Sequence, residues 1–267
     1  MAPRVFSFGG GVQSTAALVL AARGEIDFPV FLFANVGDDS EDPKALKYIE
    51  EYSKPYASDH KIDLIELHRI PSRGKDKGKK TTIYSNVIGD NRSIIIPIFM
   101  KGGAPGRRGC TTHFKAKVIE KWTNSNGGTK ESPAIVGMGI SIDEIQRMKD
   151  SRTDTQKFEY PLIDLRLSRS DCRKIILDSG LPVPPKSSCW FCPFHKKSQW
   201  IEMKTNRPDL FQRAIDMEHK INEKRKMLGK DRVYLHSSRT PLENAVPIQD
   251  SFIDEIDDFC DSGFCFV

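Results

Sequence analysis

The sequence lacks any apolar run long enough to span a bilayer, because polar residues interrupt its longest apolar stretches. Its first residues, MAPRVFSF, contain neither the apolar core of a signal peptide nor a small-residue cleavage site. Internal repeats and low-complexity tracts are absent as well. We therefore expect a cytoplasmic protein that makes no use of a membrane.

What remains is the composition of an ordinary globular protein. With 38% apolar and 29% charged residues in 267, the chain can form one large domain or one domain with an appended lobe. Six cysteines in a cytosolic chain of this size do not suggest a disulfide framework. They stand at Cys110, Cys172, Cys189, Cys192, Cys260 and Cys265.

The net charge of +5 is small but unevenly distributed. Residues 69–80 and 101–109 are basic, rich in glycine and poor in large apolar side chains. Two interpretations stand side by side: solvated loops, or loops that hold a polyanion such as a nucleic acid or a charged nucleotide. The stretch near the C-terminus is acidic, so the positive charge belongs to the body of the protein.

Apolar patterning predicts strands and helices in alternation over the first 70 residues. Strands are expected at residues 4–8, 28–37 and 62–70, and helices at 12–24 and 42–61. The order β-α-β-α-β implies a parallel sheet with right-handed crossovers. The continuous apolar run at 28–37 is typical of a strand buried on both faces.

The rest of the chain continues this pattern and then becomes helical. A helix is expected at residues 114–125, a strand at 133–141, and helices at 168–180 and 197–229. We expect an α/β fold with an open, mainly parallel twisted sheet covered by helices on both faces. We place this core at residues 1–165, with a helical C-terminal region at residues 166–267 that packs on it and carries five cysteines.

Three glycines, Gly9-Gly10-Gly11, lie between the first strand and the first helix. Backbone N–H groups converge at such a turn and the helix dipole is positive there, so it favours an anion. A Walker loop would end in Gly-Lys-Ser/Thr, and a dinucleotide fingerprint would have a third glycine where Ser14 stands. Neither motif is present, and a glycine turn without a ligand is the alternative.

Gly10, Gly11 and Ser14, with Thr15 behind them, spell Gly-Gly-x-x-Ser. This resembles the pyrophosphate-binding PP-loop of the ATP-pyrophosphatase superfamily, whose fold is adenine nucleotide alpha-hydrolase-like. Gly9 replaces the motif's first serine and Val12-Gln13 replaces the usual Lys-Asp, which favours the subgroup nearer to phosphoadenosine phosphosulfate (PAPS) reductases. The resemblance implies that ATP or PAPS binds at Gly9, Gly10, Gly11, Gln13, Ser14, Thr15, Asn35, Gly37, Asp38 and Gly137.

Residues 34–43, ANVGDDSEDP, follow the second strand and resemble the family segment that approaches the adenine nucleotide. Ligands of open α/β sheets bind at the carboxyl ends of strands. Asp38 and Asp39 are candidates to hold Mg²⁺ through water. Capping of the following helix by Ser40 or Asp42 is the alternative, and we prefer it for those residues.

Residues 106–122 resemble the Arg-x-Cys-Thr-x-x-x-Lys segment of PAPS-reductase-like and DNA phosphorothioation proteins. Arg108, Cys110, Thr111 and Lys115 occupy its positions. An arginine fork suits phosphate or sulfate oxygens, whereas a lysine acts as a point charge.

Residues 137–151 are similar to a further family stretch, Gly-x-x-x-x-Glu-x-x-Arg, with Glu144 and Arg147 in the matching positions. A salt bridge on the surface of a helix is the alternative explanation of that pair.

Cys189 and Cys192 form Cys-x-x-Cys, which brings two thiolates close enough to share a metal. Cys110 is the natural third ligand, beside the expected nucleotide site. A fourth ligand would come from Cys265, Cys260 or His195, or one iron of a [4Fe-4S] cluster would stay open. The family resemblance ranks the cluster above zinc, and zinc above a dithiol redox pair.

The other cysteines have separate interpretations. Cys265, in the apolar tail FCFV, is a candidate ligand or sulfur carrier, and Cys172 is expected to be a buried core thiol. His195 is expected to be a structural hydrogen-bonding residue more than a ligand. The resemblance thus gives Cys110, Arg108, Lys115 and Cys265 as catalytic candidates.

The resemblance implies an ATP-pyrophosphatase-type, iron–sulfur-dependent sulfurtransferase that adenylates and thiolates a nucleic acid or nucleotide. The alternatives are a PAPS or APS reductase, and a nucleotide-binding module without turnover or with zinc in place of the cluster. Besides the adenine nucleotide, the implied partners are tRNA or DNA and a cysteine desulfurase or thioredoxin-type donor.

Overall fold

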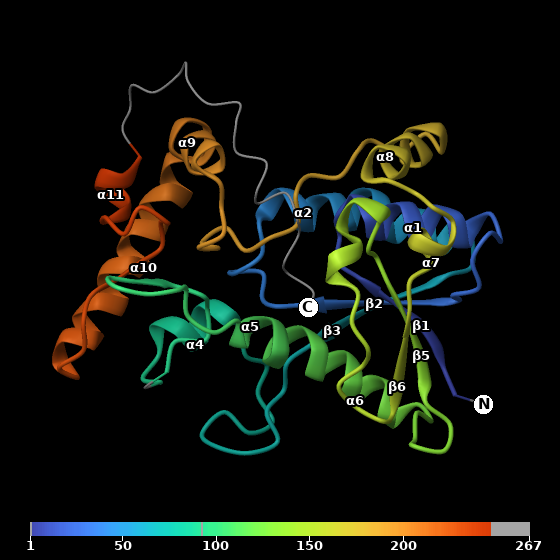
Figure 1. Cartoon of the computed structure of the whole chain (residues 1–267), viewed down its shortest axis with the longest axis horizontal. Helices are drawn as coiled ribbons and strands as arrows, with labels where there is room; N and C mark the ends of the chain where they lie inside the picture. Colours follow the sequence, from blue (N-terminus) through green and yellow to red (C-terminus); the bar gives the residue numbers. More distant parts are fainter. Residues whose placement is uncertain (1, 92, 247–267) are drawn as a thin grey trace. The chain divides into compact units, whose positions relative to one another are not determined.

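A computed structural model describes residues 2–91 and 93–246, which form two compact units (Figure 1). The first unit comprises residues 2–81 and 111–188, and the second comprises residues 82–110 and 189–246. These bounds differ from the predicted core (1–165) and C-terminal region (166–267). The predicted division into a core and a C-terminal region stays a prediction.

The first unit is built on a five-stranded sheet of order β3-β2-β1-β5-β6, in which every neighbouring pair is parallel. The strands are β1 (Arg4–Phe8), β2 (Val30–Asn35), β3 (Asp63–His68), β5 (Ala134–Met138) and β6 (Gln156–Glu159). The chain winds from β1 outward to β3 and then returns to the other side of β1. The strand order therefore reverses between β1 and β5.

Helices cover both faces of this sheet, as the sequence predicts. Phe6 and Phe31 point to one face with their rings stacked at 4.9 Å between centroids, and helices α1 (Val12–Ala22) and α8 (Arg169–Asp178) share that core. Val5 and Leu32 point to the opposite face, where α6 (Lys117–Ser125) packs. Both faces of the central strands are buried, which explains their continuous apolar sequence.

The remaining helices of the first unit are short. The predicted helix at 42–61 is observed as α2 (Pro43–Tyr48), a π-helical turn (Ile49–Ser53) and α3 (Lys54–Asp59). A second π-helical turn (Thr112–Ala116) precedes α6 and follows α5 (Gly109–Thr111), whose first two residues belong to the second unit. A 3₁₀ helix (Ile142–Arg147) and α7 (Pro161–Asp164) complete the unit.

The second unit is mainly helical, with a small β ribbon. It contains α4 (Ile83–Ile88), α9 (Lys197–Asn206), α10 (Pro208–Met227) and α11 (Leu242–Ala245), and β4 (Phe99–Met100) pairs antiparallel with β7 (Val233–Tyr234). The single helix predicted at 197–229 is in fact two, because Pro208 cannot continue a helix and begins a new one.

A buried carboxylate links α10 to two later segments of the second unit. Glu218 of α10 is 1% exposed and accepts the backbone N–H of Leu235 at 2.8 Å and of Leu242 at 3.1 Å. Burial raises the pKa of this carboxyl group, although the two hydrogen bonds oppose that effect.

Among the described residues, no helix is both long and apolar enough to cross a membrane. Cys260 and Cys265 lie outside the described residues.

Candidate functional site

The glycine turn has a defined internal geometry. Gly10 has φ +71°, which favours glycine, and Gly11 is the N-cap of α1. Ser14 folds back on this turn: its Oγ accepts the N–H of Gly11 at 3.1 Å and donates to the carbonyl of Gly11 at 3.0 Å. The N-terminus of α1 therefore begins at a turn that its own first-turn serine holds in shape.

The glycine turn lies where the strand order reverses. It follows β1, and the end of the neighbouring strand β5 comes close to it: a Cβ built on Gly139 would lie 3.4 Å from the backbone nitrogen of Ser14. The crevice at the carboxyl ends of such strands is where open α/β sheets bind ligands.

Gln13 connects the turn to the segment after β5. Its Nε2 donates to Glu144 Oε2 at 3.2 Å and lies 3.5 Å from Ser141 Oγ, while its Oε1 accepts from Arg169 at 3.2 Å. Gln13 is 8% exposed. Its side chain is thus committed to protein partners on both sides.

Glu144 and Arg147 form the i,i+3 salt bridge that the alternative explanation expects, but its side chains are each 5% exposed, so its predicted place on the surface is wrong. The pair is buried next to Gln13. Ser141 and Arg169, which the sequence reasoning did not select, belong to the same network. Ser141 lies inside the Gly-x-x-x-x-Glu-x-x-Arg stretch, whereas Arg169 belongs to α8 and had no sequence signal.

The end of β2 carries a second polar network. Asn35, 2% exposed, donates to Asp38 Oδ1 at 2.8 Å and to Glu66 Oε1 at 2.7 Å, and it accepts the N–H of Gly37 at 2.7 Å. Gly37 has φ +125°. Burial would raise the pKa of Glu66, but hydrogen bonds from Asn35 and Lys54 outweigh it and lower that pKa.

The polar residues that follow Gly37 make different contacts. Asp42 caps α2 by accepting the N–H of Lys44 at 2.9 Å, which confirms the capping alternative for this residue. Ser40 instead donates to Asp39 at 2.8 Å. Asp38 is exposed, and its Mg²⁺-binding role stays a prediction.

An extended segment missed by the sequence reasoning lies over the glycine turn. A Cβ built on Gly10 or Gly11 would come within 3.8 Å of Ser187. The carbonyls of Pro182 and Ser188 accept hydrogen bonds from the Tyr48 hydroxyl at 2.6 Å and the Asp42 N–H at 3.0 Å. The proline-rich composition of this segment does not predict where it lies.

Two predicted binding residues are buried for reasons of packing. Gly137 in β5 faces aromatic rings, since a Cβ there would lie 2.6 Å from Phe6 and 2.8 Å from Phe28. Thr15 is fully buried, and its Oγ1 makes no hydrogen bond among the described residues. A nucleotide-binding role for either stays a prediction.

The catalytic candidates differ in their surroundings. Lys115 is buried, and its Nζ lies 3.8 Å from Glu41 Oε1. The guanidinium of Arg108 lies over the Phe194 ring at 5.5 Å from its centroid. Half-buried Cys110 donates its backbone N–H to Ile95 at 2.9 Å. Cys265 lies outside the described residues.

Cys189 and Cys192 lie in a turn that the backbone closes on itself. The N–H of Cys192 donates to the carbonyl of Cys189 at 3.1 Å, and His195 Nε2 lies 3.0 Å from the same carbonyl. Because a carbonyl only accepts, Nε2 of His195 donates this hydrogen bond, while a role of this histidine as a metal ligand stays a prediction. Both cysteines are half-buried.

The turn is supported by an aromatic cluster within the second unit. Trp190 is 1% exposed and packs edge-on against Phe191 at 4.7 Å between centroids. The guanidinium of Arg213 lies 4.8 Å from the Trp190 ring. The backbone of the Cys-x-x-Cys turn is therefore held by a well-packed neighbour.

Within residues 2–91 and 93–246, no three His, Cys, Asp or Glu side chains are grouped so that they could hold a metal ion. The predicted ligand set of Cys110, Cys189, Cys192 and Cys265 stays a prediction. Cys172 is a fully buried core thiol, as predicted, and burial raises its pKa to about 12.

The fold and the glycine turn define an open, parallel α/β protein. No family model and no curated protein matches the chain. Among solved structures it is similar to the U34-tRNA thiolase NcsA from Methanococcus maripaludis with its [4Fe-4S] cluster, at TM-score 0.39 and 10% identity over 85% of this chain and 73% of that one. A likeness this weak says nothing about function.

Proposed function

We propose that the glycine turn binds the phosphates of an adenine nucleotide and that the protein is a PP-loop-type ATP pyrophosphatase. The observation that carries the proposal is the position of the turn. Gly9-Gly10-Gly11 joins β1 to the N-terminus of α1 at the reversal of strand order between β1 and β5. Neither a glycine turn alone nor a parallel sheet alone would support it.

The surrounding residues suit this ligand. The first-turn N–H groups of α1 and its dipole favour phosphate oxygens. Asn35 and Gly37 stand at the end of the adjacent strand β2, where the rest of the nucleotide would extend. Asp38 is exposed beside them and would hold Mg²⁺ through water.

The reaction we propose is sulfur transfer in two balanced steps. An oxygen of the acceptor attacks the α-phosphorus of ATP, the α–β bond breaks and pyrophosphate leaves. Hydrosulfide then attacks the adenylated carbon, and AMP leaves with the former acceptor oxygen. The acceptor would be a nucleic acid or a nucleotide.

A metal centre at the cysteines is a separate proposal. Cys189 and Cys192 would supply two thiolates, with Cys110 and Cys265 as the others. The described residues do not assemble such a set, so no reaction step is assigned to a [4Fe-4S] cluster or to zinc.

The test is an assay of ATP cleavage with α-labelled nucleotide, tRNA or DNA, and sulfide. AMP and pyrophosphate are the expected products, and Ser14→Ala should lower the rate while exposed Ser132→Ala should not. ADP with phosphate would contradict the proposal. Sulfite released from PAPS would identify a reductase, and tight binding without cleavage would identify a binding module.

The metal proposal has its own test. Protein purified without oxygen should contain iron with labile sulfide, or zinc, and should lose it in Cys189→Ala and Cys192→Ala. Cys172→Ala is the matched control, because its thiol lies in the core of the first unit. Metal-free wild-type protein would overturn the metal centre while leaving the ATP proposal to its own assay.

A further inference from the structure

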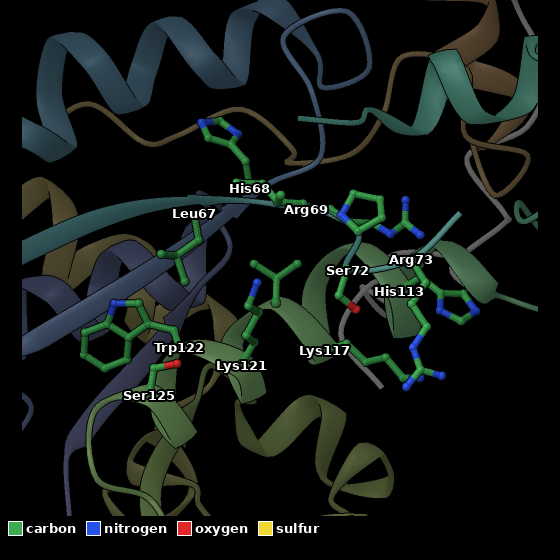
Figure 2. A pocket seen from close by; sticks show the side chains of 13 residues that line it. Leu67, His68, Arg69, Ser72, Arg73, His113, Lys117, Lys121, Trp122 and Ser125 are labelled. Carbon is green, nitrogen blue, oxygen red and sulfur yellow. The ribbon is translucent and has the colours of Figure 1, made fainter. Parts of the chain in front are cut away.

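A cavity of about 530 Å³ lies in the first unit, away from the glycine turn. One wall is the end of β3 with the loop that follows it, and the other is the helical stretch at residues 112–125 (Figure 2). Its lining residues are Leu67, His68, Arg69, Ile70, Pro71, Ser72, Arg73, His113, Lys117, Val118, Lys121, Trp122 and Ser125. None of these is acidic, and six carry basic side chains.

The basic side chains have few internal partners. Among the described residues, Arg73, Lys117 and Lys121 form no ion pair with a carboxylate. Arg69 is held in place instead, since it donates to Thr81 Oγ1 at 2.9 Å and lies 4.8 Å from the Phe114 ring. Three lysine and arginine charges therefore face the cavity without neutralisation.

The basic side chains of the cavity can be followed in Figure 2. Figure 2 shows the side chains of Arg73 and Lys117 pointing toward one another, with the His113 ring beside them. His68 instead contacts Glu66 and points away from that group. Like charges brought together destabilise each other, and a bound anion would remove that cost.

The basic residues of the cavity also affect the pKa of His113. Burial lowers the pKa of this histidine, and the charges of Lys117 and Arg69 lower it further. Two acidic residues outside the lining act on basic residues of the cavity: Asp76 on Arg69, and Glu66 on His68.

The spacing of the charges fits more than one phosphate. Lys117 and Lys121 are one turn apart on α6, which separates them by about 6 Å along the helix axis. Arg73 faces Lys117 from the opposite wall. A row of cations at this spacing can contact successive phosphate groups, whereas a single orthophosphate would reach only part of it.

The cavity is also separate from the glycine turn. α6 covers the face of the sheet that carries Leu32, whereas α1 covers the face that carries Phe31. No residue of the turn lines the cavity. The loop at residues 69–80 adds exposed Lys75, Lys77, Lys79 and Lys80, which extend the positive surface beyond it.

We propose that this basic cavity is a second phosphate-binding site, which holds successive phosphates of a single-stranded nucleic acid or of a free polyphosphate. The extension of positive charge along residues 69–80 favours the nucleic acid. The site goes beyond the proposed function, because it requires neither ATP cleavage nor the glycine turn.

The test compares two double variants of the full chain. Lys117→Ala/Lys121→Ala removes two exposed cavity charges, and Lys130→Ala/Lys157→Ala removes two exposed charges elsewhere on the first unit. Binding of labelled thymidine and uridine 20-mers is measured by fluorescence anisotropy at several salt concentrations. The cavity variant should bind about tenfold more weakly at low salt, and its salt slope should fall by about 1.4 for two lost phosphate contacts.

Further arms separate the sources and protect against misfolding. Lys117→Arg/Lys121→Arg keeps the charges and should bind as the wild type does. If the cavity variant loses affinity only for tripolyphosphate, the ligand is a free polyphosphate. Equal affinity of the two alanine variants for every probe, or equal competition by orthophosphate and tripolyphosphate at matched ionic strength, would overturn the proposal.

Discussion

The ammonium nitrogen of Lys115 lies 3.8 Å from Oε1 of Glu41, and the two side chains are only 10% and 2% exposed. A charge buried to this extent needs a partner, because it has lost its hydration. The pair therefore gives Lys115 a structural role in addition to the catalytic role that the family resemblance implies.

Removing one charge of this pair should destabilise the protein. Glu41→Gln is expected to lower the free energy of unfolding by about 3 kcal/mol, because it removes an opposite charge that lies 3.8 Å from the buried ammonium. Glu51→Gln is the matched control: Lys47 and Glu51 are also 3.8 Å apart, but their side chains are 71% and 51% exposed. The control should lose less than about 0.5 kcal/mol in urea unfolding, and equal losses would contradict the structural role.

The glycine turn can be tested through Gly10. Gly10→Ala places a Cβ 2.8 Å from Cδ1 of Ile49 at φ +71°, whereas Gly24→Ala has a nearly equal φ of +74° and no atom within 4 Å. The two variants have similar backbone strain because their φ angles are nearly equal. We therefore attribute the difference between their free energies of unfolding, expected to be about 1–3 kcal/mol, to the contact with Ile49. Titration with a non-hydrolysable ATP analogue should show lost affinity for Gly10→Ala alone, and unchanged affinity would refute the site.

Gly137 can be tested for the packing of β5 against the aromatic rings of Phe6 and Phe28. Its substitution by alanine would drive a Cβ to 2.6 Å from Phe6 and 2.8 Å from Phe28, both buried, so a loss of about 1–3 kcal/mol is expected. Gly103→Ala, with no atom within 4 Å of the new Cβ, should be nearly neutral. Thermal denaturation measures both variants. A Gly137→Ala protein of wild-type stability would show that the rings can move away.

The stability of the second unit should fall as the pH falls below about 6.5. His236 Nδ1 accepts the N–H of Ser238 at 3.1 Å, so protonation at that nitrogen would break the bond. Burial lowers the pKa of His236, and the charge of Lys197 lowers it further. The unfolded chain then binds a proton that the folded chain does not, with a slope of up to about 1.4 kcal/mol per pH unit.

The measurement is urea unfolding between pH 7.5 and pH 5.5. His236→Gln should flatten the pH dependence, because glutamine does not titrate. A slope that survives in His236→Gln would assign the effect to other groups.

Strong local patterns made much of the first unit predictable. The apolar runs around Phe6 and Phe31 fixed β1 and β2, and the parallel order followed from the helices between them. β6, at Gln156–Glu159, was missed because this short edge strand has no apolar run. β4 and β7 are each only two residues long, so their sequences are too short to show the alternation of apolar and polar residues that predicts a strand.

Local motifs of the site were predictable, but contacts between distant segments were not. The glycine turn and the cap at Asp42 depend on neighbouring residues, which the sequence displays directly. The hydrogen bond from Arg169 to Gln13 joins residues that are 156 positions apart in the sequence. The burial of the Glu144–Arg147 ion pair depends on the segments that pack against it. Such contacts follow from the fold as a whole.

The two hydrogen bonds between Ser14 and Gly11 are internal to the chain, so they hold the glycine turn independently of any ligand. A loop already ordered by its own side chain loses little conformational entropy when it captures an anion. Association at this turn should then proceed at a rate set by diffusion and charge, without a slow rearrangement of the backbone. Ser14→Ala would make capture slower as well as weaker, which a stopped-flow measurement can distinguish.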